Sequence, residues 1–483
     1  MQIRKELAKG TFWTAVGSYS HYIFAFITSA ILARLLEPAD FGVVSMVLVY
    51  TGFVDLLAEF GISATVVQKR FLDQTGLSTV FWFATLIGAV LTGITVLIAP
   101  ALESFFSFSG LSLVVQVMSI KLLLVSLGTV PQGLLHKKLA FKQLAALEIS
   151  TTVLSGITGI TLAFLGCGYW ALVAQGISLR LFRVLGLFVI TKWLPLFRLQ
   201  LDIVREVIDF SGNLLGFRMI NYWSRNVDNL LIGRTLGSVQ LGYYNQAYTL
   251  MMYPIRMLSS IINPSIQPVF ATSQDEPERI APTYLLLIEL IALITLPLGV
   301  FLWVYAGPVI RVLWGSQWEA SIPVFEVLAL LTMVQPILAT TGSVFVARNQ
   351  VKLLFRLGAV TSMIIIAGIA AGLRFGLVGV ATGYAVAFLF FATPLTLFYL
   401  ARTLEVKLSH LLSVFIKPAL IAFILMPALL VFRSLNLPWV DIGITATAAF
   451  IMAVIWTGLT YLLYRREYKR IIELLRGRHN AKV

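Results

Sequence analysis

The chain has 483 residues, of which 59% are hydrophobic and 12% are charged, and its mean hydropathy is +0.90. A soluble domain carries about twice this share of charged residues, so the composition excludes a soluble globular protein. A single cysteine and four scattered histidines argue against a disulfide framework and against a metal centre, and we expect no cofactor. The net charge of +14 suggests a nucleic-acid partner, but the positions of the basic residues argue against one.

Apolar stretches long enough to cross a bilayer, roughly 20 residues each, follow one another along nearly the whole chain. We predict fourteen membrane-spanning helices at 12–35, 41–60, 77–99, 111–135, 147–165, 169–191, 208–235, 241–265, 283–306, 322–346, 353–373, 376–400, 415–432 and 440–463. No soluble domain fits between them. The predicted fold class is therefore an all-α polytopic membrane protein.

The basic residues are distributed unequally between the two sides of the membrane. If both termini lie on one side, that side holds 25 of the 36 lysines and arginines. The loops on the opposite side hold only Arg311, Arg374 and Arg433. Because Lys and Arg accumulate in cytoplasmic loops, we predict that both termini are cytoplasmic.

The two halves of the chain repeat one another at a spacing of 200 residues. Within the segments 33–42 and 233–242, Arg34, Leu36 and Gly42 recur as Arg234, Leu236 and Gly242. Each copy joins two apolar runs by a very short turn, so we predict turn-locking, structural roles for these arginines and glycines. Duplicated halves in a membrane protein are typical of transporters, whose substrate path runs between the halves.

A second repeat relates 164–171 to 374–381 and extends the duplication over six spans in each half. We predict two pseudo-symmetric six-helix lobes plus two extra C-terminal helices. The predicted domains are an N-terminal lobe (1–191), an interfacial cytoplasmic linker (192–207), a C-terminal lobe (208–400), helices 13 and 14 (401–463) and a basic cytoplasmic tail (464–483). Prolines inside several spans, such as Pro336 and Pro394, are either static kinks or hinges for alternating access.

Charged residues inside the spans indicate where a site could lie. A charge near the bilayer centre costs about 2.5–3.5 kcal/mol, so it should face a cavity or a partner. Away from the helix ends, the basic residues are Lys121, Arg180, Arg183, Arg218, Arg225 and Arg256, and the clearest acidic ones are Asp55 and Asp228. This excess is positive, whereas internal salt bridges alone would predict a balance.

Helical spacing groups some of these residues on common faces. Arg218, Tyr222 and Arg225 are four and three residues apart, and Arg180 and Arg183 are three apart. Several guanidinium groups in one cavity select anions, because their forks match phosphate oxygens. We therefore predict a pyrophosphate- and sugar-binding cavity lined by Lys121, Arg180, Arg183, Arg218, Tyr222, Arg225 and Arg256.

Structural alternatives exist for the same residues. Arg225 and Asp228 are three apart and could form an ion pair within one helix. Arg180 and Arg183 could extend toward the cytoplasmic headgroups. Asp55 could pair with an arginine or carry a coupling proton.

The motifs Ala33-Arg34-Leu35-Leu36, Asp40-Phe41-Gly42, Arg225-Asn226-Val227-Asp228, Leu231-Ile232-Gly233-Arg234 and Leu241-Gly242-Tyr243-Tyr244 resemble a known family. That family is the polysaccharide transporters, the bacterial lipid-linked oligosaccharide flippases of the Wzx type, and the resemblance is closest to exporters of colanic acid and similar exopolysaccharides. The resemblance covers the whole chain. It implies export of an undecaprenyl-pyrophosphate-linked repeat unit across the bacterial inner membrane by alternating access. It also implies a cationic central cavity and a lipid-tail groove beside helices 13 and 14.

The predicted function is that of a flippase rather than an enzyme. Its expected partners are the lipid-linked oligosaccharide and membrane lipids, with a polysaccharide polymerase as a further candidate and no nucleic acid. The first alternative is a multidrug or peptidoglycan-precursor exporter of the same superfamily. The alternative from another class is a membrane-integral polysaccharide polymerase or acyltransferase, which would need a catalytic loop or a buried His or Asp cluster.

Overall fold

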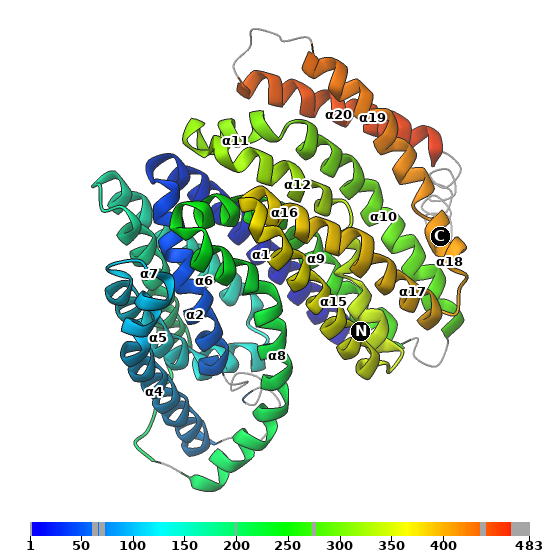
Figure 1. The fold of residues 1–483 in the computed structure, drawn as a ribbon. Helices are drawn as coiled ribbons and strands as arrows, with labels where there is room; N and C mark the ends of the chain where they lie inside the picture. Colours follow the sequence, from blue (N-terminus) through cyan, green and yellow to red (C-terminus); the bar gives the residue numbers. More distant parts are fainter. Residues whose placement is uncertain are drawn as a thin grey trace. The chain divides into compact units, whose positions relative to one another are not determined.

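The architecture comes from a computed structural model of the chain. It describes residues 2–59, 66, 73–198, 200–272, 277–434 and 441–464; within the helices, the side chains of 2–9, 11, 201, 206–218, 220, 221, 224, 259–272 and 277–279 lie outside the described set. The regular elements of these ranges are all helices (Figure 1). Ten of them are long and apolar enough to cross a membrane, and a bent pair of shorter helices passes the same test as one span. The chain is therefore a multi-pass, all-helical membrane protein.

The helices form two compact units. The first comprises Met1–Gln246 and Ile369–Val380, and the second comprises Ala247–Gly368 and Ala381–Val483. The predicted domain boundaries at 191, 207, 400 and 463 stay predictions, since compact packing and repeat boundaries are different properties of a chain.

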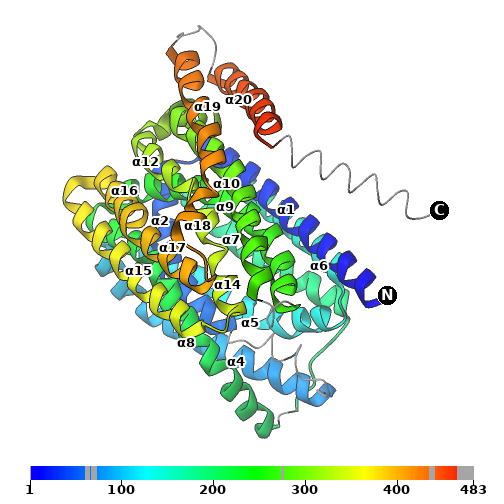
Figure 2. The ribbon, with the colours of Figure 1, turned by 90° about the vertical axis from the view of Figure 1, so that its right-hand side faces the viewer.

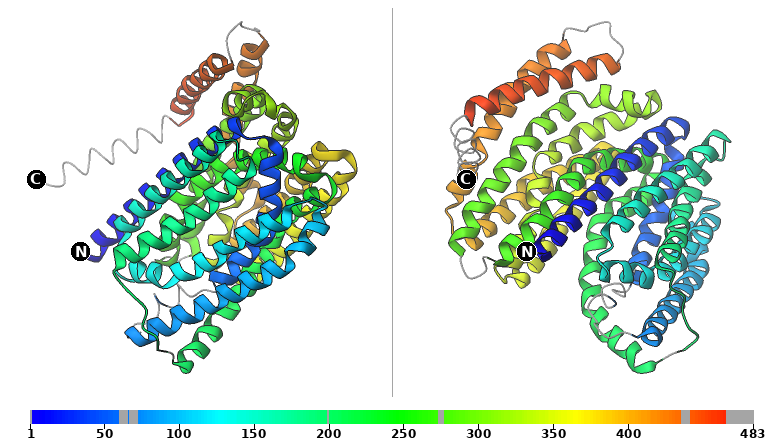
Figure 3. Two further views of the ribbon diagram at one scale, coloured as in Figure 1. Left: turned by 90° about the vertical axis from the view of Figure 1, so that its left-hand side faces the viewer. Right: turned by 180° about the vertical axis from the view of Figure 1, so that it is seen from behind.

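The first unit is built from seven long helices and the start of an eighth. They are α1 (Gln2–Leu35), α2 (Pro38–Glu59), α4 (Gln74–Phe106), α5 (Leu111–Lys137), α6 (Phe141–Phe164), α7 (Tyr169–Thr191), α8 (Leu201–Thr235) and the first turns of α9 (Gly237–Thr272). Helix α5 packs against α4, α2 and α7, while α6 packs against α1 and α7 (Figure 3). Helix α8 packs against α2 and α4.

Small residues let these helices approach closely. A Cβ atom on Gly88 of α4 would overlap Ser126 of α5, and one on Gly156 of α6 would lie 2.6 Å from the Thr28 hydroxyl of α1. Since lipid tails are as apolar as the helix surfaces, close packing rather than the hydrophobic effect holds such helices together. The glycines therefore determine which faces meet.

The segment after α7 runs along the N-terminal end of α4. The Ser78 hydroxyl accepts from the Leu196 backbone N at 2.9 Å, and the Trp82 indole N–H donates to the Leu196 carbonyl at 2.9 Å. The Phe197 ring stacks on Trp82 with centroids 4.8 Å apart. Leu194 and Phe197 are exposed, and Lys192 adjoins them. Exposed aromatic and basic residues are typical of a membrane–water interface, and the interfacial role of this linker stays a prediction.

The second unit contains the remaining helices (Figure 2). They are most of α9, then α10 (Pro277–Val304), α11 (Ala306–Trp314), η1 (Ser316–Ser321), α12 (Ile322–Thr332), α13 (Gln335–Leu338), α14 (Thr341–Ala347), α15 (Val351–Gly372), α16 (Gly376–Val386), η3 (Ala387–Ala392), α17 (Thr393–Thr403), α18 (Leu408–Ser413), α19 (Ile416–Ser434) and α20 (Asp441–Leu463). The end of α15, η2 (Leu373–Phe375) and the start of α16 belong to the first unit.

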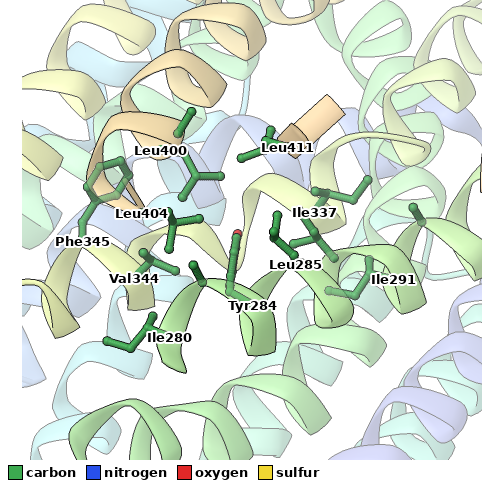
Figure 4. Close-up of a cluster of buried hydrophobic side chains, with 14 of the residues drawn as sticks. Ile280, Tyr284, Leu285, Ile291, Ile337, Val344, Phe345, Leu400, Leu404 and Leu411 are labelled. Atoms are coloured by element: carbon green, nitrogen blue, oxygen red, sulfur yellow. The ribbon is translucent and has the colours of Figure 1, made fainter. Parts of the chain in front are cut away.

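A cluster of buried side chains from α10, α13, α14, α15, α17 and α18 forms one core of this unit (Figure 4). Tyr284 is fully buried in it, and its hydroxyl lies 3.0 Å from Thr340 Oγ1, so its polar atom is satisfied. Ile337, Phe345 and Leu400 pack around it. The core thus joins elements that are more than one hundred residues apart in the sequence.

Two predicted spans are irregular for identifiable reasons. The span predicted at 322–346 is broken into α12, α13 and α14, with a bend of 46° between Ser316–Thr332 and Gln335–Ala347. Pro336 lies at the break, where its missing N–H interrupts the hydrogen-bond ladder. The span predicted at 376–400 contains the π-helical turn η3 directly before Pro394. Such a turn accommodates a proline inside a helix.

The two C-terminal helices are fixed to α10 and α11 within the second unit. The Arg311 guanidinium forms a two-point ion pair with the Asp441 carboxylate at 2.9 and 3.2 Å. Arg433 donates to the Val304 carbonyl at 2.8 Å, and the Trp456 indole donates to the Leu293 carbonyl at 2.9 Å. These helices are therefore an integral part of the unit.

The predicted total of fourteen spans includes α8 and α9. Both helices are longer than 30 residues, but among the described residues neither is apolar enough to be recognised as a span by hydropathy. The apolar stretch Val351–Thr403 is one of the ten helices counted above, although it contains two predicted spans. The total of fourteen thus stays a prediction.

Candidate functional site

Three of the predicted site residues meet inside the first unit. Asp55 lies on α2, Lys121 on α5 and Arg180 on α7, and these three helices pack against one another. Lys121 is only 6% exposed. Its ammonium group is attracted by the Asp55 carboxylate and repelled by the Arg180 guanidinium. We refer to Asp55, Lys121 and Arg180 as the charged cluster.

The charged cluster is not closed by direct ion pairing. Within the described part of the chain, Asp55 and Lys121 form no salt bridge, and Asp55 Oδ1 is buried without a hydrogen-bond partner. Buried carboxylate oxygens are normally saturated with donors, because an unpartnered buried charge is costly. Lys121 thus has one carboxylate nearby, which is itself incompletely satisfied, and a second cation, Arg180, on its other neighbouring helix.

Arg183, one turn beyond Arg180 on α7, has a different environment. The carboxylates of Glu148 and Glu59 attract its guanidinium, and Arg180 repels it. Glu148 is half-buried and Glu59 is exposed. The charge around Arg183 is therefore closer to balance than the charge around Lys121.

Tyr222 fastens α8 to α2. Its hydroxyl lies 3.0 Å from the Leu48 carbonyl and 2.9 Å from the Val49 carbonyl, and its ring packs against Phe53 at 6.0 Å between centroids. The absence of a side chain at Gly52 leaves room for this hydroxyl, since a Cβ there would come within 2.5 Å of it. The Asp55 carboxylate also acts electrostatically on Tyr222. The predicted sugar contact of this residue stays a prediction.

The other predicted cations lie on α8 and α9. Arg218 lies on α8 with its side chain outside the described set, Arg225 is exposed on the same helix, and Arg256 is exposed on α9 in the second unit. Their binding roles stay predictions.

Asp228 has a partner that the sequence did not suggest. Its carboxylate accepts from the Tyr244 hydroxyl at 3.0 Å and from the Asn229 backbone N at 2.8 Å, and the residue is 6% exposed. An ion pair between Arg225 and Asp228 is not found among the described side chains. The sequence placed Tyr244 in a family motif but did not indicate its contact with Asp228, because that contact depends on how α9 folds back on α8.

The repeated turns contact each other through equivalent residues. A Cβ on Gly42 would overlap the Ser238 carbonyl, and a Cβ on Gly242 would overlap the Pro38 carbonyl. Positions 38, 42, 238 and 242 form two pairs at the repeat spacing, so the contact is reciprocal, as in a twofold-symmetric interface. The same symmetry continues in a hydrogen bond from Asn245 to Ser45.

The two arginines of the repeat lie at helix ends. Arg234 donates to the Phe105 carbonyl and to Ser107 Oγ, and its guanidinium lies 5.3 Å from the Phe105 ring centroid. It thereby occupies carbonyl acceptors at the C-terminus of α4. Arg34 is exposed at the end of α1. Among the described residues no group of three His, Cys, Asp or Glu could hold a metal ion.

Residues 31–323 match the model of a family described as polysaccharide biosynthesis protein. The chain belongs to this family. The resemblance inferred from the repeated motifs is thereby confirmed. Relatives include the teichuronic acid biosynthesis protein TuaB of Bacillus subtilis (strain 168), 26% identical over 73% of this chain and 74% of TuaB. They also include the lipopolysaccharide biosynthesis protein WzxC of Escherichia coli (strain K12), 24% identical over 80% of this chain and 79% of WzxC.

A third relative is the succinoglycan biosynthesis transport protein ExoT of Rhizobium meliloti (strain 1021), 26% identical over 68% of this chain and 66% of ExoT. Among solved structures, the fold is similar to that of the lipid II flippase MurJ in an inward closed conformation. That match has a TM-score of 0.76 and 14% identity over 94% of this chain and 99% of MurJ. An inward-facing MATE-family multidrug transporter matches with a TM-score of 0.63 and 16% identity over 80% of this chain and 94% of the transporter. The chain of this polysaccharide biosynthesis family thus has the MurJ and MATE fold.

Proposed function

We propose that the protein is a flippase that moves an undecaprenyl-pyrophosphate-linked oligosaccharide from the cytoplasmic to the periplasmic leaflet of the bacterial inner membrane. It does not alter the oligosaccharide chemically. Family membership and the names of WzxC and ExoT support a role in the transport step of polysaccharide biosynthesis. The product is an exopolysaccharide or O-antigen repeat unit, and a polysaccharide polymerase is a candidate partner that receives it.

The observation that carries this proposal is the buried ammonium group of Lys121, beside which the half-buried Arg180 adds a second positive charge. Placing such groups among apolar helices is costly, so they are expected to serve an anionic ligand. Ammonium and guanidinium groups both bind phosphate oxygens, and the guanidinium does so with two parallel hydrogen bonds. A pyrophosphate head fits this chemistry, whereas a cationic drug does not.

The mechanism is alternating access by two six-helix lobes of a fourteen-helix protein with cytoplasmic termini. Arg183, Arg218, Arg225 and Arg256 extend the cationic route from the cytoplasmic mouth outward. The head exchanges guanidinium partners as the lobes move. Both conformations must bind it with similar affinity, because tight binding in one would trap it.

Fold similarity leaves two alternatives within transport, since one similar structure is a lipid II flippase and another is a multidrug transporter. Reconstitution into proteoliposomes separates them. We would supply a fluorescent undecaprenyl-pyrophosphate oligosaccharide, lipid II or a cationic dye, and follow access of a membrane-impermeant quencher. Accelerated exchange of the oligosaccharide supports the proposal. Exchange of lipid II or the dye alone supports an alternative, and chemical conversion of the substrate would reveal an enzyme.

The cationic route is tested in the same assay with Arg180→Ala, Arg225→Ala and Arg256→Ala. We expect each to lower the exchange rate about tenfold or more, which corresponds to about 1.4 kcal/mol of barrier. Arg374→Ala is the matched control, because this arginine is exposed in η2. Wild-type rates in all three variants would leave the arginines as structural residues.

A further inference from the structure

We propose that Asp55 is a built-in counter-anion, which holds Lys121 and Arg180 while no substrate is bound and yields them to the anionic head of the substrate. Asp55 thereby lowers the affinity for the head and allows its release. This inference rests on the proposed function and concerns the same charged cluster.

The geometry of Asp55 is that of an incompletely engaged group. One of its carboxylate oxygens is buried and accepts no hydrogen bond. The nearby Tyr222 hydroxyl cannot relieve it, because that hydroxyl contacts the Leu48 and Val49 carbonyls of α2. A carboxylate that served only to stabilise the unit would be expected to have its acceptor positions filled. Asp55 instead holds its cations loosely.

The charges around Asp55 explain why a weak interaction between its carboxylate and the nearby cations would help transport. Lys121 is 6% exposed, and Arg180 adds a second positive charge that repels it. With no anion nearby, a buried Lys121 ammonium beside the half-buried Arg180 would be strongly unfavourable. With a permanently bound pyrophosphate, the substrate would not leave. A tethered carboxylate offers the same oxygen acceptors as phosphate but one unit of charge, so it can be displaced and can return.

An ordinary structural ion pair makes the opposite prediction. If Asp55 only stabilised Lys121, its neutralisation would leave a buried uncompensated ammonium and would weaken both folding and anion binding. If Asp55 competes with the substrate, its neutralisation should strengthen anion binding and slow release. Affinity and transport rate therefore change in opposite directions only under the proposal.

The test is Asp55→Asn in purified full-length protein in nanodiscs, with inorganic pyrophosphate as the probe. We expect pyrophosphate to bind about tenfold more tightly than to the wild type, or about 1.4 kcal/mol. In proteoliposomes, exchange of the labelled lipid-linked oligosaccharide should become slower. Asp202→Asn is the matched control, because Asp202 is exposed in the first turn of α8 and loses the same charge. It should leave both measurements unchanged.

Unchanged or weaker pyrophosphate binding by folded Asp55→Asn overturns the counter-anion. Should that variant not fold, Asp55→Asn combined with Lys121→Gln is compared with Lys121→Gln alone. The double variant should still bind pyrophosphate more tightly, because Arg180 is released, and equal or weaker binding overturns the proposal. Failure of the proposed function is a separate result, since it appears as wild-type protein that does not exchange the lipid-linked oligosaccharide.

Discussion

One oxygen of the buried Asp228 carboxylate, Oδ2, accepts its side-chain hydrogen bond from a tyrosine hydroxyl. Tyr244 is fully buried and donates to Asp228 Oδ2 at 3.0 Å. The substitution Tyr244→Phe keeps the ring but leaves this oxygen without its side-chain donor. We expect it to lower the free energy of unfolding by about 1–3 kcal/mol, the cost of an unsatisfied buried group. The measurement is the midpoint of thermal unfolding in detergent.

Asp228→Asn is the comparison for this prediction. The amide keeps an oxygen that can accept from Tyr244 and removes a charge from an apolar environment, so its midpoint should lie well above that of Tyr244→Phe. Equal midpoints for Tyr244→Phe and the wild type would show that the hydroxyl contributes nothing.

Arg234 closes the C-terminal end of α4 through the Phe105 carbonyl, Ser107 Oγ and the Phe105 ring. Arg234→Ala removes these contacts, and we expect a loss of about 1 kcal/mol of stability because the side chain is exposed. Arg234→Lys should recover only part of the loss, since an ammonium lacks the planar fork. A stability change equal to that of Arg374→Ala would contradict this role.

For single residues, the sequence identified the candidate site residues but not the side chains that contact them. Asp55, Lys121 and Arg180 could be singled out because charges are rare in apolar spans. Helical periodicity says which residues share a face, but not which helix that face meets. For this reason Arg225 was the only partner the sequence offered for Asp228, whereas the structure provides Tyr244 from the next helix.

The first turns of α2 and α9 fit together only because each contains a glycine at the contact. A methyl group on Gly42 would overlap the Ser238 backbone, and one on Gly242 would overlap the Pro38 backbone. Backbone cannot rotate away as a side chain can, so Gly42→Ala and Gly242→Ala should each cost about 1–3 kcal/mol of stability. The readouts are the yield of monodisperse protein and its thermal midpoint.

Gly93→Ala is the control for the glycine contact. Gly93 lies within α4, and an added methyl group there would meet nothing within 4 Å. Since alanine is also the better helix former, this variant should be neutral or slightly stabilising. The reciprocal contact would be refuted if Gly42→Ala and Gly242→Ala behaved like Gly93→Ala.

Helix boundaries follow hydropathy where a span is continuous. The helix α7, Tyr169–Thr191, has the same bounds as the predicted span. The short helices α11 and η1 were not predicted, because nine or fewer residues are too few for a hydropathy window to recognise. Apolar residues of α11 such as Val309 and Ile310 are nevertheless buried within the unit. The break at Pro336 and the π-helical turn before Pro394 depend on tertiary packing, which a hydropathy window averages out.

At the scale of the whole molecule, the duplication was readable because equivalent turns kept Arg, Leu and Gly at one spacing. The all-helical membrane fold and the family were also predictable, and family comparison confirms the latter. The number of spans was harder, because α8 and α9 carry polar residues such as Arg225 and Asn245 that lower their hydropathy. Polar faces of this kind are expected where helices line a route rather than face lipid.

Whether α8 and α9 cross the membrane can be decided by the location of the turn between them. Gly237, with a φ of +85°, lies in the short turn between the helices, and the hydrogen bond from Tyr244 to Asp228 shows that α9 runs back along α8. We therefore expect Val239, exposed just after this turn, to lie in the periplasm, while exposed Arg198 and Glu405 lie in the cytoplasm.

Single cysteines at these positions, in a Cys167→Ser background, can be labelled with a membrane-impermeant maleimide. Val239→Cys should react in intact spheroplasts, whereas Arg198→Cys and Glu405→Cys should react only after permeabilisation. The comparison isolates the two helices, because removing one pair of crossings moves Val239 to the cytoplasmic side and leaves Glu405 where it was. Protection of Val239→Cys in spheroplasts, followed by labelling after lysis, would reduce the protein to twelve spans and separate Arg218 and Arg225 from any transmembrane route.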